Sequence, residues 1–263
     1  MDFELKSRLK SGKTVIGPFV RLSEPAILEM LGYAGFDFCI IDLEHGPMSV
    51  HQAENLVRTA RGVGISPIIR IRENEQTLAL RAMDTGAAGI QIPQVNSAEM
   101  AEASVRFAKF HPHGERGVCR FTRAAHYSDI PREQYFQNSN ASSVVVLQIE
   151  GLGGVNDIDR IVEIEGYDAL FIGPYDLSQA LGLTGQVSHP DVLKTIESIT
   201  KKARDQGLVV GTFADCPESI GMYIDMGLQY LATYIDTGLF YQTSKDRVEE
   251  IRTMIAARNV IGL

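Results

Sequence analysis

Short apolar runs alternate with longer amphipathic stretches along the whole chain. The apolar runs are four to eight residues long, as is typical of buried strands, and they comprise Thr14–Val20, Phe36–Asp42, Ser66–Ile71, Gly89–Ile92, Ser143–Glu150, Ala169–Ile172, Val209–Thr212 and Gln229–Thr233. Helical periodicity fits Glu24–Ala34, Val50–Gly62, Glu75–Thr85, Ala98–Phe110, Asn156–Ile164, Asp191–Gln206, Pro217–Met226 and Ser244–Arg258. This alternation predicts an α/β fold, a single-domain (β/α)₈ TIM barrel, with a doubly wound open sheet as the alternative.

Boundary signals support these elements. Ser49 and Gln52 form a capping box before the helix that begins at Val50, and Pro190 suits a first helical position. A glycine stands between a helix and the next strand at Gly35, Gly64, Gly207 and Gly227, where a left-handed residue often ends a helix.

One segment, His111 to Ser142, shows no regular pattern. A loop of this length in a compact domain is usually functional or part of an interface. The chain has no composition break, low-complexity tract or repeat of solenoid period. We therefore expect one domain over residues 1–263.

Bulk properties narrow the class of protein. The 263 residues suit a barrel of about 250 residues. The net charge of −8, with scattered lysines and arginines, argues against a nucleic-acid partner. Three distant cysteines indicate a reducing compartment, and neither a signal-like segment nor a run of about 18 apolar residues is present. These features predict a cytoplasmic protein without a membrane partner.

Carboxylates follow three of the predicted strands. The strings VVVLQIEG and LFIGPYDLS place Glu150 and Asp176 at the ends of consecutive strands, and IIDLEHG places Asp42, Glu44 and His45 after the second strand. In a barrel, the carboxyl ends of the strands meet at the catalytic rim. Hard divalent cations favour such an oxygen-rich site.

Other polar residues converge on the same rim. Arg70 ends the third strand, and Gln148 shares a strand face with Val146 and Glu150. A single rim carboxylate more often caps a helix or pairs with arginine. The combination of Glu150, Asp176, Arg70 and His45 favours a functional site.

These motifs resemble the HpcH/HpaI family of class II, divalent-metal-dependent pyruvate aldolases, in the phosphoenolpyruvate/pyruvate barrel superfamily. The resemblance runs nearly end to end and rests on GFDFCIIDLEHGPMS, PIIRI, QIPQVNSAEMA, VLQIEG and FIGPYDLSQALGLTG. Two departures stand out. Phe19 replaces a tryptophan common in these aldolases, and His126 lies where relatives often carry arginine near a subunit contact.

The resemblance implies a role for each rim residue. Glu150 and Asp176 would bind Mg²⁺, Mn²⁺ or Co²⁺, and Arg70 would contact the keto oxygen. His45 would be the acid/base group, with Asp84 as its orienting partner. The remaining assignments are the pyruvate pocket for Gln148, the substrate carboxylate for the backbone of Gly173, Pro174, Tyr175 and Asp176, and an outer supporting role for Asp42 and Glu44.

The implied activity is carbon–carbon bond cleavage. A 4-hydroxy-2-oxo acid, of the 4-hydroxy-2-oxoheptanedioate or 2-dehydro-3-deoxy-aldarate type, would give pyruvate and an aldehyde through a metal-bound pyruvate enolate. Oxaloacetate decarboxylation, or another lyase reaction that traps the enolate, is the alternative, and a non-catalytic binding barrel is a third. The family also implies a homohexamer in which dimers exchange the last helix, Ser244–Arg258.

The lysines argue against a Schiff-base aldolase, which needs a desolvated lysine inside the barrel. Lys6, Lys10 and Lys13 lie near the start of the chain, and no lysine follows an apolar strand. We expect Lys109, Lys194, Lys201, Lys202 and Lys245 on or near polar helix faces.

Overall fold

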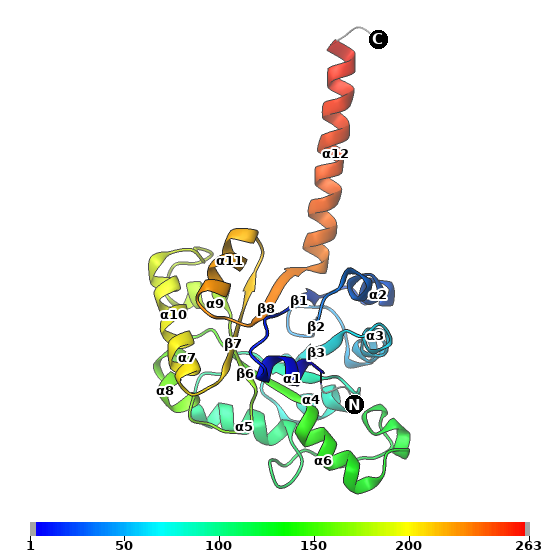
Figure 1. The fold of residues 1–263 in the computed structure, drawn as a ribbon, viewed down its shortest axis with the longest axis vertical. Helices are drawn as coiled ribbons and strands as arrows, with labels where there is room; N and C mark the ends of the chain where they lie inside the picture. Colours follow the sequence, from blue (N-terminus) through cyan, green and yellow to red (C-terminus); the bar gives the residue numbers. More distant parts are fainter. Residues whose placement is uncertain (1–3, 261–263) are drawn as a thin grey trace.

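Eight parallel strands close into a barrel in the computed structural model, which describes residues 4–260 (Figure 1). Each strand pairs with the next in sequence, and β1 closes the barrel against β8. The strands are β1 (Val15–Val20), β2 (Phe38–Asp42), β3 (Ser66–Arg70), β4 (Gly89–Ile92), β5 (Val144–Ile149), β6 (Ala169–Ile172), β7 (Val209–Ala214) and β8 (Tyr230–Ile235). The predicted TIM barrel is confirmed, and the open-sheet alternative is wrong.

Helices surround the barrel, and most lie where the periodicity predicted them. They are α1 (Glu4–Lys10), α2 (Pro25–Ala34), α3 (Val50–Gly62), α4 (Gln76–Asp84), α5 (Ala98–Ala108), α6 (Arg132–Ser142), α7 (Leu152–Asn156), α8 (Ile158–Ile161), α9 (Pro174–Ala180), α10 (Pro190–Asp205), α11 (Pro217–Asp225) and α12 (Asp236–Val260). A 3₁₀ helix, η1, covers Arg123–Ser128. The domain boundaries predicted at residues 1 and 263 lie outside the described residues.

The boundary signals act as expected. Ser49 and Gln52 form both bonds of the capping box at the start of α3, and Pro190 is the first residue of α10. The four glycines Gly35, Gly64, Gly207 and Gly227 all have positive φ.

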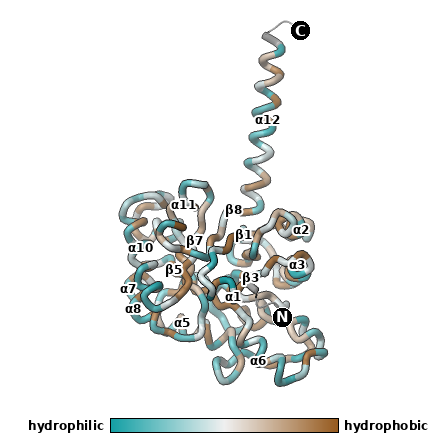
Figure 2. The backbone as a smooth tube through the Cα atoms, viewed as in Figure 1, coloured by the Kyte–Doolittle hydropathy of each residue, from teal (hydrophilic) through white to brown (hydrophobic). Residues whose placement is uncertain are grey.

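Strand alternation divides the hydrophobic residues between two cores. One alternate set of strand residues fills the barrel interior, where the rings of Phe38 and Tyr230 stack at 4.3 Å. The other set, such as Ile41 on β2 and Leu147 on β5, packs outward in the same cluster as residues of the surrounding helices. Hydrophobic colouring accordingly marks the central strands in Figure 2. Because both faces are buried, the strands appear in the sequence as continuous apolar runs.

The segment His111–Ser142 is not irregular throughout, because it contains η1 and α6. In α6 only Tyr135, Ser139 and Ser142 are buried, so the sequence shows no apolar stripe of helical period. The short helices α1, α7 and α9 were also not predicted, and the helix predicted over Asn156–Ile164 is shortened to α8, Ile158–Ile161. The last helix begins eight residues earlier than expected, at Asp236 rather than Ser244.

Helix α12 projects away from the barrel (Figure 1). Its large apolar side chains are exposed: Phe240, Tyr241, Val248, Ile251, Met254 and Ile255. Within residues 4–260, none of the helices combines the length and the hydrophobicity required to cross a membrane.

The barrel interior should reject a single added methyl group at Gly211. A Cβ built there would lie 2.2 Å from the Tyr230 carbonyl oxygen on the neighbouring strand. We expect Gly211→Ala to lower the free energy of unfolding by about 1–3 kcal/mol, through overpacking. Gly221→Ala is the control, because Gly221 lies in α11 with no atom within 4 Å of the new Cβ. Equal effects of the two changes in urea denaturation would contradict this account.

Candidate active site

Most of the rim residues predicted from the sequence line one cavity of about 690 Å³ at the carboxyl ends of the strands, whereas Asp42 and Glu44 lie behind its wall. The first turns of α12, from Thr237 to Thr243, close one side of it. Its lining includes the predicted residues His45, Arg70, Gln148, Glu150, Gly173, Pro174, Tyr175 and Asp176. The structure thus brings these eight residues together.

Asp42 organises the rim. It is fully buried at the end of β2 and accepts two bonds from Arg70, from Nε at 2.9 Å and from Nη2 at 2.8 Å. Arg21 Nε donates to it at 3.0 Å, and so do the backbone N–H groups of Glu44 and His45. Burial opposes ionisation, but the bonds and charges of Arg70 and Arg21 outweigh it and hold the pKa of Asp42 below its ordinary value.

Arg70 is held by one aromatic ring against its guanidinium plane and by carboxylates at its edge. The group lies 4.6 Å from the centre of the Phe19 ring. Its Nη1 is 2.9 Å from Glu44 Oε2, although this oxygen receives no well-aligned hydrogen bond among the described residues. Burial chiefly, together with the charges of Asp42 and Asp176, raises the pKa of Glu44 to about 7. Arg70 is therefore preorganised, with donors left over for a ligand.

Glu150 lies just beyond β5, with its side chain turned into the barrel, as the strand parity predicted. It accepts from Gln94 N–H at 2.9 Å and from Gln148 Nε2 at 2.5 Å. Burial, with the charges of Asp176 and Glu44, raises its pKa to about 7 despite these bonds. A Cβ on Gly173 would lie 2.4 Å from Glu150 Oε2, so only glycine leaves room for this carboxylate.

The donor set fits Mg²⁺ or Mn²⁺. Glu150 and Asp176 line the same cavity, and the charge of Asp176 contributes to the raised pKa of Glu150. Residues 4–260 contain no cluster of three or more His, Cys, Asp or Glu side chains able to enclose a metal alone. Magnesium usually keeps several waters and takes only one or two carboxylates plus substrate oxygens. The two rim carboxylates, Glu150 and Asp176, match that requirement.

At the start of α9, fewer backbone N–H groups are free to bind a substrate carboxylate than the sequence predicted. The Gly173 N–H donates to the Ile149 carbonyl at 3.1 Å, and Pro174 has no N–H. Only the N–H groups of Tyr175 and Asp176, in the first turn of α9, lack a partner within the helix.

His45 and Asp84 do not meet within the chain. His45 lines the catalytic cavity, and its half-exposed ring lies 4.0 Å from Glu44 Oε2. Asp84 ends α4, which runs back to the opposite, amino end of the barrel, and it pairs with Arg116 at 2.6 Å. The predicted pairing of these two residues would therefore require two copies of the chain.

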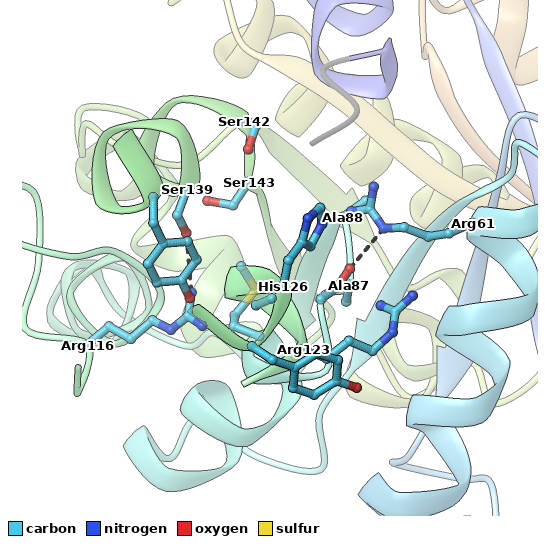
Figure 3. A pocket seen from close by; sticks show the side chains of 14 residues that line it. Arg61, Ala87, Ala88, Arg116, Arg123, His126, Ser139, Ser142 and Ser143 are labelled. Carbon is cyan, nitrogen blue, oxygen red and sulfur yellow. Dashed lines mark hydrogen bonds between the residues drawn. The ribbon is translucent and has the colours of Figure 1, made fainter. Parts of the chain in front are cut away.

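A second cavity, of about 460 Å³, lies at that amino end (Figure 3). Arg61, Arg116, Arg123 and His126 contribute to its wall, and three consecutive residues from His126 to Ser128 have positive φ. Arg61 and Arg123 donate to the carbonyls of Gly86 and Thr85. This face, with Asp84 beside it, is thus rich in cationic groups although the whole chain is acidic.

The expectation that Lys109 lies on a polar helix face is wrong. It is 3% exposed, and its Nζ donates to the carbonyls of Asn140 and Ser143 and to the Ser143 hydroxyl. Burial lowers its pKa to about 7. Ser143 precedes β5 at the amino end, so this buried lysine lies away from the catalytic cavity and leaves the case against an imine unchanged.

The sequence analysis missed Arg21, which lines the cavity and binds Asp42. Its place directly after the first predicted strand is the signal that could have identified it. Asp236, at the start of α12, was also missed; it accepts the backbone N–H groups of Arg21 and Leu22. It therefore ties α12 to this edge of the site.

Removal of the Asp42 charge should destabilise the chain in a pH-dependent way. Asp42→Asn removes the fully buried, bidentate counter-charge of Arg70 and leaves only Glu44 beside it, and breaking a buried pair typically costs about 3–5 kcal/mol. Because the folded pKa of Asp42 lies below the unfolded value of about 3.9, its contribution is full above pH 4 and declines as the pH falls. The unfolding free energies of wild type and Asp42→Asn should thus differ strongly at pH 7 and converge at acidic pH. A constant difference would contradict this assignment.

Comparison with known proteins agrees with this geometry. A family model described as HpcH/HpaI aldolase/citrate lyase matches residues 15–243. The chain is 35% identical over 237 residues to a 5-keto-4-deoxy-D-glucarate aldolase from Escherichia coli O157:H7, covering 90% of this chain and 92% of that protein. It is 34% identical over 249 residues to a hydroxypyruvate/pyruvate aldolase from Roseovarius nubinhibens, covering 94% and 96%.

A solved structure gives the same result in three dimensions. The HpcH/HpaI aldolase from Desulfitobacterium hafniense superposes with a TM-score of 0.88 at 34% identity, covering 94% of this chain and 96% of that one. Sequence, fold and site together show that the chain belongs to the HpcH/HpaI aldolase/citrate lyase family.

Proposed function

We propose that the chain is a divalent-metal-dependent pyruvate aldolase that cleaves a 4-hydroxy-2-oxo acid to pyruvate and an aldehyde. The observation that carries the proposal is one cavity lined by two carboxylates, Glu150 and Asp176, and by a preorganised Arg70. No lysine lines that cavity, which favours a metal route over an imine. The names of its relatives favour a 2-dehydro-3-deoxy-aldarate as substrate.

The residues would divide the chemistry as follows. A divalent ion held by Glu150 and Asp176 would act as a Lewis acid at the keto oxygen of the substrate. Arg70 would donate to that oxygen and stabilise the negative charge that develops as the carbon–carbon bond breaks. The backbone N–H groups of Tyr175 and Asp176 would bind the substrate carboxylate, and Gln148 would line the pyruvate pocket.

His45 would accept the proton of the C4 hydroxyl during cleavage. Its ring is at the rim, and imidazole is the side chain that most often transfers protons in enzymes working near neutral pH. The orienting carboxylate would be Asp84 of a second copy, because the Asp84 of the same chain lies at the other end of the barrel. Fixing the tautomer of a histidine is a common role for such a carboxylate.

Helix α12 supports assembly of copies. An exposed helix is stable in water chiefly when an apolar face packs against something, and α12 projects free of the barrel. Its apolar positions Tyr241, Val248 and Ile255 recur every seven residues. We propose that α12 packs on another copy, within a homohexamer.

Oxaloacetate decarboxylation remains the second candidate. It generates the same pyruvate enolate, so the same Arg70 and carboxylates would serve it. It needs no base at a C4 hydroxyl, and His45 should matter less to it.

Metal removal gives the direct test of the proposed function. EDTA should reduce pyruvate release from a 2-dehydro-3-deoxy-aldarate to background, and Mg²⁺, Mn²⁺ or Co²⁺ should restore it. Rates with oxaloacetate, measured in parallel, rank the two activities. Full turnover by metal-free protein, or a pyruvate imine trapped by borohydride, would contradict the proposal.

Arg70→Lys should retain the fold and lose activity. Lysine keeps the charge but cannot reproduce the bidentate bonds to Asp42 or the planar donor set. Losing a preorganised donor typically costs about 10²–10³ in rate. We expect that loss in kcat, with circular dichroism confirming the fold. A near-normal kcat would remove Arg70 from the mechanism.

Mixing of inactive variants tests the two-copy pairing of His45 and Asp84. His45→Ala and Asp84→Asn should each lower aldol cleavage by about 10²–10⁴. In mixed oligomers, random assembly would rebuild about a quarter of the composite sites, and activity should return in proportion.

The matched control mixes His45→Ala with Glu150→Gln. His45 and Glu150 line the same cavity of one chain, so no chain in this mixture has both residues, and the proposal predicts a smaller recovery of activity. Equal recovery in the two mixtures, no recovery in either, or light scattering from a monomer, would contradict the pairing.

A further inference from the structure

Three buried polar side chains form a row inside the barrel at the catalytic end. Gln91 on β4 donates from Nε2 to Gln148 Oε1 at 2.5 Å, and Gln148 Nε2 donates in turn to Glu150 Oε2 at 2.5 Å. All three side chains are at least 98% buried. Gln91 has no place in the reaction described above, and it does not line the catalytic cavity.

The chemistry of the groups fixes the direction of this row. A carboxylate that binds a metal ion is ionised and can only accept hydrogen bonds, so Gln148 must turn its NH₂ group toward a metal-binding Glu150. The Gln148 oxygen then faces Gln91, which must donate a hydrogen bond to it from its NH₂ group. If Gln148 rotated by 180° about its last bond, its oxygen would lie against Glu150 Oε2.

Only the NH₂ group of the Gln91 amide forms a hydrogen bond among the described residues. Its Oε1 is buried and has no hydrogen-bond partner among residues 4–260. Such an orphaned acceptor is unfavourable, and an apolar side chain of the same size would avoid it. The bond from its NH₂ group to Gln148 is therefore what glutamine adds at this position.

We propose that Gln91 is a positioning residue for the metal site: its bond to Gln148 Oε1 holds the amide that orients Glu150. This inference rests on the proposed metal binding by Glu150 and Asp176. Each Glu150 oxygen accepts one hydrogen bond from the protein, from Gln94 N–H or Gln148 Nε2. These two bonds fix the orientation of the carboxylate and leave a second lone pair on each oxygen free to bind a metal ion. Groups that orient metal ligands in this way typically contribute about 10–100-fold to metal affinity.

The competing explanation is that Gln91 merely fills the barrel. The two explanations differ in a double-mutant cycle of Mn²⁺ affinity, measured by calorimetry or electron paramagnetic resonance on the full chain. Gln91→Met removes the donor and keeps the volume. Gln148→Met removes the middle of the row. Thr200→Val is the control, because it deletes a buried hydrogen bond in α10, on the outside of the barrel.

We expect Gln91→Met to weaken Mn²⁺ binding about tenfold. It should have no further effect in the Gln148→Met background, because the path to Glu150 is already broken. Thr200→Val should bind Mn²⁺ like the wild type. If Gln91→Met alone fails to fold, Gln148→Met and the double variant still give the test, and they should bind Mn²⁺ equally.

Wild-type affinity in Gln91→Met, or additive losses in the double variant, would overturn the positioning role and leave the metal site intact. If Glu150→Gln and Asp176→Asn bind Mn²⁺ as tightly as the wild type does, the proposed metal site itself fails, and this inference with it.

Discussion

The buried pair between Asp42 and Arg70 is the interaction on which the rim depends. Two hydrogen bonds of 2.8–2.9 Å join the side chains. Asp42 also accepts hydrogen bonds from Arg21 Nε and from the backbone N–H of His45. One carboxylate thus fixes an arginine and the start of the loop that carries His45. A buried pair of this kind adds little net stability compared with apolar packing, but removal of either partner is costly. The role of the pair here is to fix the position of the arginine donors beside the carboxylates that line the cavity.

The barrel explains why these residues converge. Parallel strands end at the same rim, and the period of two places Gln148 on the inner face of β5 and turns Glu150, the residue after that strand, to the same side. Gly173, after β6, leaves the space that Glu150 occupies. The row from Gln91 to Glu150 crosses between two such strands. Closing the sheet therefore orients the carboxylate before any ligand binds, which lowers the entropy cost of binding.

Much of this could be predicted from the sequence because it depends on local pattern. Strand runs, glycine helix ends and the parity of Glu150 require only neighbouring residues. Helix α6 could not be predicted, because Tyr135 is its one large buried side chain. Lys109 looked like a surface lysine because its acceptors lie 31 and 34 residues away.

The position of Asp84 shows the same limit. Its helix was predicted, but its distance from His45 follows only from the direction in which α4 runs. The roles of the individual site residues remain predictions, whereas the family and the barrel are established.

A crystal structure of the chain with Mn²⁺ and pyruvate tests the central claim most directly. The account predicts the ion between Glu150 and Asp176, with the pyruvate keto oxygen turned toward Arg70 and Arg70 still paired with Asp42. An ion bound away from those two carboxylates, or pyruvate bound with Arg70 turned out of the cavity, would contradict it.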